Sequence, residues 1–316
     1  MKKMAVLDDY SGAAASLAPW SKLAERVEID FFHDHRTDID ELVSRLEPYQ
    51  IICAMRERTV FSAQLIDRLP NLRHLFTSGM RNAAIDLEAA TRNGIVVSGS
   101  PTLSYPTVEL TFGLMLALAR DVVGQSGSLR DGGWQTALGV SLHNKTLGII
   151  GLGRLGSAVA HIAAAFGMEV IAWSRNLTEE KCAQEGVELR SFEALMAESD
   201  VISIHVKLGE GSRGLINEQA LAHIKRTALL INTSRGEVVN DQDLVAALSE
   251  GRLLGAALDV FDQEPLPADH PLLAAPRLLL TPHLGYSVEE NFRLFFEQAI
   301  ENISAWLGGE IINRLN

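Results

Sequence analysis

The stretch that decides the fold is LGIIGLGRLGSAVA, residues 147–160. A run of aliphatic residues predicts a buried β-strand, and the alanine-rich segment after it predicts a helix. Between them, Gly151, Gly153 and Gly156 form G-x-G-x-x-G in the strand, turn and helix setting that a dinucleotide fingerprint requires. Gly151 permits a tight turn, Gly153 lets the backbone approach a pyrophosphate, and Gly156 permits close packing of helix on sheet. The residues of this segment assigned to cofactor binding are Gly151, Gly153, Arg154, Leu155 and Gly156.

Segments of strand and helix character alternate on both sides of this motif. Short β-branched or apolar runs precede it at 4–7, 27–32, 51–55, 72–78 and 94–98. A second series lies at 146–151, 169–173, 201–206, 228–234, 254–261 and 278–283. Helical three-to-four spacing of apolar residues appears between several of the runs. The alternation predicts an α/β fold with parallel sheets.

Two features predict a division into two domains. Small residues and two prolines interrupt the alternation in SGSPTLSYP, residues 98–106. After His283 the chain becomes one amphipathic helix whose expected partner is the first domain. Its apolar face carries Phe292, Phe295, Phe296, Ile300, Ile303 and Trp306. We therefore expect a substrate domain of residues 1–99 completed by 287–316, and a dinucleotide-binding domain of residues 100–286.

Composition excludes several classes of protein. A hydrophobic content of 47% in 316 residues fits folded α/β domains, and a net charge of −12 argues against a nucleic-acid partner. Cys53 and Cys182 are the only cysteines and lie in no metal-type spacing, so we expect reduced thiols, a cytoplasmic protein and no metal. The most apolar segment, residues 110–119, is too short to span a bilayer, so no membrane partner is expected.

The end of the strand at 169–173 bears on the choice of cofactor. An acidic residue that binds the ribose 2′-hydroxyl usually lies about 20 residues past the fingerprint. Here the chain has Ser174, Arg175 and Asn176 instead. These side chains can donate to a 2′-phosphate, which favours NADP over NAD. The alternative is that Arg175 stacks on the adenine while NAD is used.

Three polar residues lie at or just beyond strand ends. They are Arg235 in INTSRGEVV, Glu264 in LDVFDQEPLP and His283 in LLLTPHLGY. Ligands of open α/β sheets bind beyond the carboxyl ends of the strands, so these side chains are expected to converge. Each alone has an ordinary structural explanation, as a surface arginine, a capping residue or a hydrogen-bonded histidine. Together, downstream of a cofactor fingerprint, they indicate a hydride-transfer site.

These motifs, in this order, resemble the D-isomer-specific 2-hydroxyacid dehydrogenase family, which includes glyoxylate, hydroxypyruvate and 3-phosphoglycerate dehydrogenases. The resemblance runs through TSGMRNAAIDL, VELTFGLMLALAR, KTLGIIGLGRLG, INTSRGEVV, GAALDVFDQEPLP and TPHLG. It implies two Rossmann-like doubly wound domains with parallel sheets, a flavodoxin-like substrate domain and an NAD(P)-binding domain, with a cleft between them. It also implies an oxidoreductase that interconverts a small 2-oxo acid and its D-2-hydroxy acid, most similar to a glyoxylate or hydroxypyruvate reductase.

The chemistry of such a substrate gives each of the three residues a role. Arg235 can pair with the carboxylate and polarise the carbonyl. His283 can give a proton to the developing alkoxide, and in reverse it acts as the base. Glu264 would accept from the other ring nitrogen, fix the tautomer and favour the protonated ring.

Other site residues are assigned by resemblance alone. Contacts with the cofactor are expected from Thr107, His205, Thr233, Ser234, Asp259 and Gly285. The N–H groups of Gly79 and Met80 would bind the substrate carboxylate. Arg56 and Arg81 are placed by their first-domain loops instead, where they could read a second anionic group; the alternative is that they are solvated or form surface ion pairs. Two departures stand out: Lys207 where the family usually has proline, and Tyr286 where smaller residues are common. The ring of Tyr286 would narrow the cleft and favour small substrates.

Two other functions have a similar fold, and one assembly state is expected. Formate dehydrogenases have a similar architecture but pair histidine with glutamine, so Glu264 argues against them. A dinucleotide-sensing binding protein, as in the family's corepressors, is the alternative to an enzyme. The leucine-rich segment at 108–120 resembles the family's dimer-forming region, so we expect a homodimer.

Overall fold

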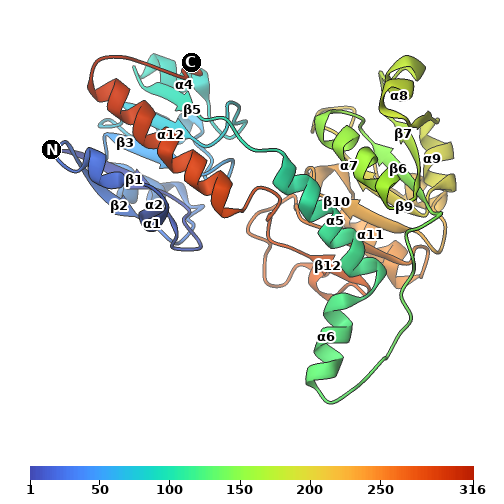
Figure 1. Cartoon of the computed structure of the whole chain (residues 1–316). Helices are drawn as coiled ribbons and strands as arrows, with labels where there is room; N and C mark the ends of the chain where they lie inside the picture. Colours follow the sequence, from blue (N-terminus) through green and yellow to red (C-terminus); the bar gives the residue numbers. More distant parts are fainter. The chain divides into compact units, whose positions relative to one another are not determined.

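The computed structural model describes all residues from 1 to 316. The chain divides into two compact units (Figure 1). Unit 1 comprises Met1–Leu103 and Ser287–Asn316, and unit 2 comprises Ser104–Tyr286. The first crossing thus lies a few residues beyond residue 99, the expected end of the first domain segment. Unit 2 is continuous in sequence, whereas unit 1 is built from both ends of the chain.

Unit 1 contains a five-stranded parallel sheet in the order β2-β1-β3-β4-β5. Its strands are β1 (Lys2–Val6), β2 (Val27–Phe31), β3 (Ile51–Ala54), β4 (His74–Thr77) and β5 (Val96–Gly99). Its helices are α1 (Ala14–Leu17), α2 (Ile39–Leu46), α3 (Ala63–Ile66), α4 (Leu87–Arg92) and α12 (Glu289–Leu307). The strand order is that of the flavodoxin-like doubly wound fold, with a switch point between β1 and β3.

The two faces of this sheet are covered by different parts of the chain. Leucines and alanines of α2, α3 and α4 pack on one face. On the other face lies α12, which runs beside β4, β5 and α1 (Figure 1). The ring of Phe296 lies 5.6 Å from that of Trp20, so the apolar face predicted for this helix is used within unit 1.

Unit 2 contains a seven-stranded parallel sheet in the order β12-β11-β10-β9-β6-β7-β8. Its strands are β6 (Thr146–Ile150), β7 (Glu169–Trp173), β8 (Glu188–Leu189), β9 (Val201–Ile204), β10 (Leu229–Asn232), β11 (Gly255–Leu258) and β12 (Leu278–Leu280). Its helices are α5 (Tyr105–Ala119), α6 (Val122–Arg130), α7 (Arg154–Ala165), α8 (Glu179–Glu185), α9 (Phe192–Glu198), α10 (Glu218–Ala222) and α11 (Asp241–Ser249). The winding reverses between β6 and β9, which is where doubly wound sheets bind ligands.

The central strands of unit 2 are buried on both faces, which explains why their sequences are mostly apolar rather than alternating. Helices α5 and α7 pack on one face of the sheet, and α9, α10 and α11 pack on the other. The predicted class, α/β with two doubly wound parallel sheets, is confirmed. The only unpredicted strand is β8, two residues long at the edge of the sheet. No helix combines the length and apolar character needed to cross a membrane.

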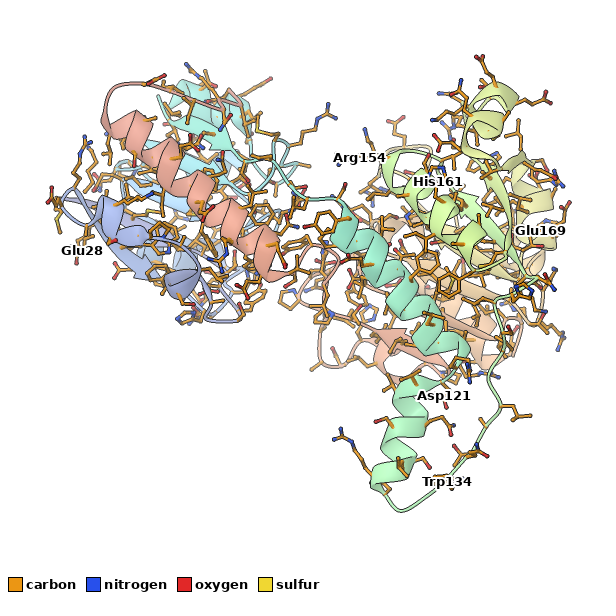
Figure 2. The ribbon with its side chains drawn as sticks, viewed as in Figure 1. Glu28, Asp121, Trp134, Arg154, His161 and Glu169 are labelled. Carbon is orange, nitrogen blue, oxygen red and sulfur yellow. The ribbon has the colours of Figure 1, made fainter.

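Helix α6 and the loop after it depart from this packing. No residue of α6 is buried, and the helix projects beyond the body of unit 2 before the chain returns to β6 (Figure 1). Figure 2 shows Trp134 near the tip of this excursion, beyond the end of α6. We call residues 121–139 the arm. Its exposed apolar side chains are Val122, Val123, Leu129, Trp134 and Leu138.

Candidate active site

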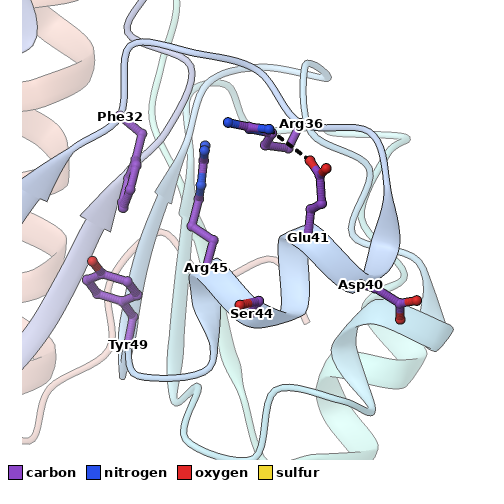
Figure 3. Close-up of a pocket in the computed structure, with 7 residues that line it drawn as sticks. All are labelled: Phe32, Arg36, Asp40, Glu41, Ser44, Arg45 and Tyr49. Atoms are coloured by element: carbon purple, nitrogen blue, oxygen red, sulfur yellow. Dashed lines mark hydrogen bonds and ion pairs between the residues drawn. The ribbon is translucent and has the colours of Figure 1, made fainter.

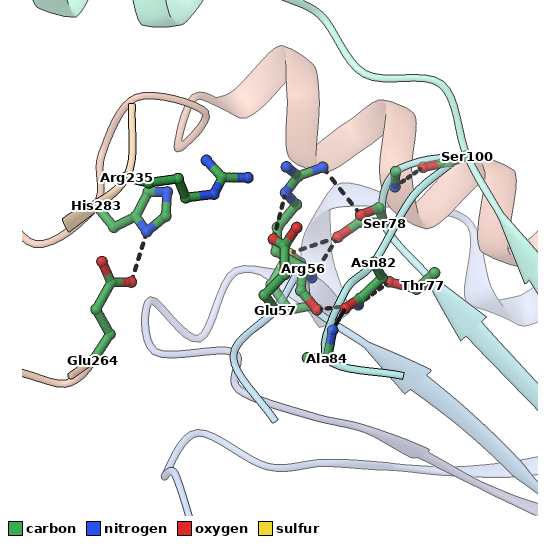
Figure 4. Close-up of polar contacts among 12 residues, drawn as sticks. Arg56, Glu57, Thr77, Ser78, Asn82, Ala84, Ser100, Arg235, Glu264 and His283 are labelled. Carbon is green, nitrogen blue, oxygen red and sulfur yellow. Dashed lines mark hydrogen bonds and ion pairs between the residues drawn. The ribbon is translucent and has the colours of Figure 1, made fainter. Parts of the chain in front are cut away.

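Three adjacent strands of unit 2 end in the polar residues that the sequence singles out. Arg235 follows β10, Glu264 follows β11 and His283 follows β12. Because β10, β11 and β12 are neighbours in one parallel sheet, their carboxyl ends lie at the same edge. The three side chains are brought together there (Figure 4).

Glu264 and His283 form a direct hydrogen-bonded pair. Nδ1 of His283 donates to Oε2 of Glu264 at 2.6 Å, and the Phe261 N–H donates to Oε1 at 2.9 Å. Burial would raise the pKa of Glu264, but the hydrogen bond and charge of His283 outweigh it and lower the pKa below its ordinary value. Arg235 adds to this lowering. Glu264 is therefore a carboxylate that holds Nδ1 and leaves Nε2 of the imidazole for other chemistry.

The loop that carries His283 is held in an uncommon conformation. His283 has a φ of 53°, in the left-handed region that non-glycine residues rarely adopt. The carboxylate of Asp259 accepts the Thr281 hydroxyl at 2.6 Å and the N–H groups of Leu284 and Gly285 at 2.7 and 2.8 Å. Burial raises the pKa of Asp259, and these three donors oppose the rise. Sequence reasoning assigned Asp259 to the cofactor and missed its hold on this loop.

Tyr286 lies directly beside the imidazole. Its ring meets that of His283 edge to face, with centroids 5.4 Å apart and planes at 75°. Only 8% of the tyrosine is exposed. The bulky residue therefore forms part of the wall around His283.

Arg235 lies in a turn that is held by Asn232 of the preceding strand. The last residue of β10, Asn232, donates through Nδ2 to the Arg235 carbonyl at 2.9 Å. The guanidinium of Arg235 is partly buried, and its Nη1 donates to the Ser234 carbonyl at 2.7 Å.

The glycine motif fits a dinucleotide. Gly151 has a φ of 104°, and an added Cβ would lie 2.8 Å from the backbone of His205. A Cβ at Gly156 would lie 2.1 Å from the Gly151 carbonyl oxygen, so this glycine allows the close approach of α7. At Gly153, which caps α7 without a side chain, a Cβ would meet nothing within 4 Å. This open space before the helix N-terminus is where a pyrophosphate binds in such folds.

His205 and four hydroxyl-bearing residues lie near the centre of the same edge. The N–H of His205 donates to the Ile150 carbonyl at 2.7 Å, Nε2 lies 2.8 Å from Ser203 Oγ, and burial lowers the pKa of His205 to about 4. The hydroxyl of Thr107 donates to the Gly285 carbonyl at 2.8 Å. Thr233 shares a hydrogen bond with Thr111 at 3.0 Å. These contacts tie α5 to the loops that follow β10 and β12.

The loop after β7 forms one side of a surface pocket of about 450 Å³. Ser174 and Arg175 line this pocket, and the guanidinium of Arg175 donates to the Gly211 carbonyl at 3.1 Å. Asn176 is exposed. Arg190 and Ser191, which sequence reasoning missed, lie on the other side of the pocket because β8 pairs with β7. Arg190 is engaged by two glutamates, so Arg175 is the better anion-binding candidate.

The substrate-side candidates lie in unit 1, after β3 and β4. Arg56 has a φ of 50°, its N–H donates to Ser78 Oγ at 2.9 Å, and its guanidinium contacts the Ser78 carbonyl (Figure 4). The Gly79 N–H donates to Ser100 Oγ at 3.1 Å and is therefore already used. Met80 and Arg81 are exposed.

A second hollow, of about 720 Å³, lies in unit 1 between α2 and the end of β2 (Figure 3). Its charged residues neutralise one another: Arg36 pairs with Glu41 at 3.0 Å, and Arg45 lies over the Phe32 ring. The hydrogen bond from Arg45 lowers the pKa of Asp34 to about 2. This network gives the hollow no charge with which to select a ligand.

Comparison with known proteins adds a family relationship to this geometry. Residues 112–285 match the family model for the NAD-binding domain of D-isomer specific 2-hydroxyacid dehydrogenases. A glyoxylate reductase of Korarchaeum cryptofilum is 36% identical over 299 residues, covering 92% of this chain and 90% of the relative. A glyoxylate reductase of Aeropyrum pernix is 40% identical over 283 residues, covering 84% of each chain. The crystal structure of a phosphoglycerate oxidoreductase from Vibrio cholerae superposes with a TM-score of 0.93 at 31% identity, covering 98% of this chain and all of the other.

Proposed function

Because the chain belongs to the D-isomer specific 2-hydroxyacid dehydrogenase family, we propose that Arg235, Glu264 and His283 are its catalytic residues. The protein is an NAD(P)-dependent oxidoreductase that interconverts a 2-oxo acid and its D-2-hydroxy acid. The observation that carries the catalytic assignment is the 2.6 Å pair of His283 and Glu264, at the same sheet edge as Arg235. The dinucleotide-sensing alternative is not favoured, since the relatives described above are named as enzymes.

Each of the three residues has a separate role in the reduction of a 2-oxo acid. Arg235 pairs with the carboxylate and stabilises charge on the carbonyl oxygen. The bound dinucleotide supplies the hydride. His283 holds a proton on Nε2 and gives it to the forming hydroxyl, while Glu264 stabilises the positive ring through Nδ1. In the oxidative direction His283 takes the proton back.

We propose that the glycine motif and the loop after β7 hold the cofactor, and that NADP is preferred. The open face at Gly153 and the first turn of α7, with Arg154 and Leu155, would receive the pyrophosphate. A 2′-phosphate would meet Arg175 and Ser174, because no carboxylate occupies the usual ribose position. Contacts near the nicotinamide are proposed for Thr107, Thr233, Ser234, Asp259 and Gly285, and a contact close to the cofactor backbone is proposed for His205.

The proposed substrate is small, with glyoxylate or hydroxypyruvate preferred. Tyr286 packs against the His283 ring and reduces the room for a substrate side chain. In unit 1, the N–H of Met80 has no partner within the chain and is proposed to bind the carboxylate, with Gly79 as part of the same loop. Arg56 and Arg81 are proposed to read a second anionic group.

We also propose a homodimer, which is supported by the exposed apolar side chains of the arm. Much of α5, including Phe112, Leu114 and Met115, is buried inside unit 2. The arm instead exposes its apolar residues, with Trp134 at 75% and Leu138 at 100% exposure. A second copy of this chain is the proposed occupant of that surface.

The test of the proposed function is a matrix of initial rates for the purified protein. NADPH and NADH oxidation would be followed with glyoxylate, hydroxypyruvate, pyruvate and a bulkier 2-oxo acid. We expect turnover with the small acids, the highest rates with NADPH, and loss of activity in His283→Asn. No turnover with any of these acids would contradict the proposed catalytic roles.

A further inference from the structure

Asn232 occupies a position in which every polar atom of its side chain is used. It ends β10 and is fully buried. Its Nδ2 donates to the Arg235 carbonyl at 2.9 Å, and its Oδ1 accepts the Ser234 N–H at 3.0 Å and the Ser234 hydroxyl at 2.9 Å. The Asn232 side chain thus bonds to Ser234 and Arg235, the two residues that follow Thr233, and holds the turn between them and β10.

Gly236, which follows Arg235 in the turn, lies very close to the loop after β11. A Cβ added to Gly236 would lie 2.0 Å from the Phe261 carbonyl carbon and 2.4 Å from the Asp262 nitrogen. These atoms are backbone, so they cannot move aside as a flexible side chain would. Only glycine lets the turn after β10 approach the loop after β11 this closely.

The loop after β11 continues to the proton-transfer pair. The Phe261 N–H donates to Oε1 of Glu264, and Oε2 of the same carboxylate holds His283. A continuous series of contacts therefore runs from Asn232 through Gly236 and Phe261 to Glu264. It joins the loop of the anion-binding arginine to the loop of the acid–base pair.

We propose that Asn232 is a positioning residue that sets the placement of Arg235 relative to Glu264 and His283, with Gly236 as the contact that joins the two loops. This inference rests on the catalytic roles proposed above. An apolar residue at 232 would leave the Ser234 N–H without its partner and would remove one of the two donors to the Arg235 carbonyl, the other being the Val238 N–H at 3.3 Å, so the turn would rearrange. A shift of about 1 Å in a substrate-orienting group can lower the rate by about 100-fold.

The first experiment compares Asn232→Ala with Asn217→Ala in steady-state kinetics. Asn217 is the matched control, since its side chain also accepts a backbone N–H in unit 2 but caps α10. For Asn232→Ala we expect KM for glyoxylate to rise roughly 10- to 100-fold, with a smaller rise in the dissociation constant of NADPH, because Thr233 and Ser234 of the same turn are proposed to contact the cofactor. Asn217→Ala should lower thermal stability without changing KM.

The second measurement does not depend on activity. Crystal structures of the wild type and Asn232→Ala would show whether the backbone of residues 233–236 moves relative to Phe261. We expect displacement of this turn, with α7 and the glycine motif unchanged. Gly236→Ala, should it fold, is expected to displace both loops and to change the pH profile as well as KM.

The outcomes separate this inference from the proposed function. If the wild type reduces no 2-oxo acid, the proposed catalytic roles fail, and a turn that stays in place in Asn232→Ala overturns the positioning role independently. An unchanged KM for glyoxylate in Asn232→Ala, or an equal loss of substrate and NADPH affinity, would also overturn it.

Discussion

Nδ1 of His283 lies 2.6 Å from Oε2 of Glu264, and the other oxygen of that carboxylate is fixed by the Phe261 N–H. The imidazole is thus held at one nitrogen by a group that is itself held in place. This arrangement restricts the orientation of the ring and leaves Nε2 outside the contact with the carboxylate.

Glu264→Gln preserves an acceptor for Nδ1 but removes the negative charge. We expect kcat/KM for the 2-oxo acid to fall about 10- to 100-fold, which is less than the roughly 100- to 10,000-fold that a positioned acid supplies in full, because the imidazole itself is retained. The loss should appear in kcat, because the charged ring loses its counter-charge. The measurement is steady-state kinetics, with Glu237→Gln as a control in the same unit. An unchanged kcat would contradict the proposed role of Glu264.

Alanine substitutions at Gly153 and Gly156 should affect different properties of the protein, the first its cofactor affinity and the second its stability. Gly153→Ala adds a methyl group to open space, so the fold should be retained while NADPH affinity falls about tenfold, a loss of about 1.4 kcal/mol. Gly156→Ala places a methyl group 2.1 Å from the Gly151 oxygen and should destabilise unit 2 by about 1–3 kcal/mol. Calorimetric melting and fluorescence titration separate the effects. Equal changes in melting temperature would reject this division.

Arg175→Ala tests the cofactor preference. If the guanidinium binds the 2′-phosphate, KM for NADPH should rise about tenfold, the value of one hydrogen bond to a charged group. KM for NADH should change little. Arg226→Ala, on an exposed residue of the same unit, is the control. A rise shared equally by both cofactors would instead indicate stacking on the adenine.

Asp241 predicts a pH dependence of stability. Burial, followed by the nearby charge of Asp262, raises the pKa of Asp241 to about 6. A carboxyl whose pKa is raised on folding adds stability while it is protonated, and this contribution is lost as pH rises through the folded-state value. Asp241→Asn should therefore gain about 1–2 kcal/mol relative to the wild type between pH 4 and pH 8. Urea denaturation of both proteins, with the exposed Asp131→Asn as control, measures this; a pH-independent difference would be contrary evidence.

The arm predicts a concentration-dependent assembly. Light scattering should give a mass of twice 34.4 kDa for the wild type at micromolar concentration. The double variant Trp134→Ala and Leu138→Ser should be monomeric, since it removes exposed apolar surface from the arm. Leu273→Ser, at an exposed leucine elsewhere in unit 2, should leave the dimer intact. A monomeric wild type would reject the proposed dimer.

The sequence was sufficient for the sheets and for the main candidate residues because both depend on local signals. Buried parallel strands are short apolar runs, and polar residues that follow such runs must lie at one edge of the sheet. Arg235, Glu264 and His283 could be found in this way. The glycine motif is equally local, since each glycine has its own steric reason.

Other features could not be read from the sequence because they depend on contacts between distant segments. Asp259 holds Leu284 and Gly285 through hydrogen bonds that span about 25 residues, and no pattern marks them. The left-handed backbone of His283 follows from the same contacts. Helix α6 has no buried face, so it lacks the apolar periodicity by which helices are predicted.

The discontinuity of unit 1 has a consequence for the order of events on the ribosome. Residues 313–316 bond to β5, and α12 covers one face of the sheet, so the first five strands lack a permanent partner while unit 2 is being made. At about 5–20 residues per second, the interval before the last helix emerges is roughly 10 to 40 s. Unit 2, continuous in sequence, can fold within that interval. The face of the nascent N-terminal sheet that α12 covers in the folded chain stays without this helix until α12 is made.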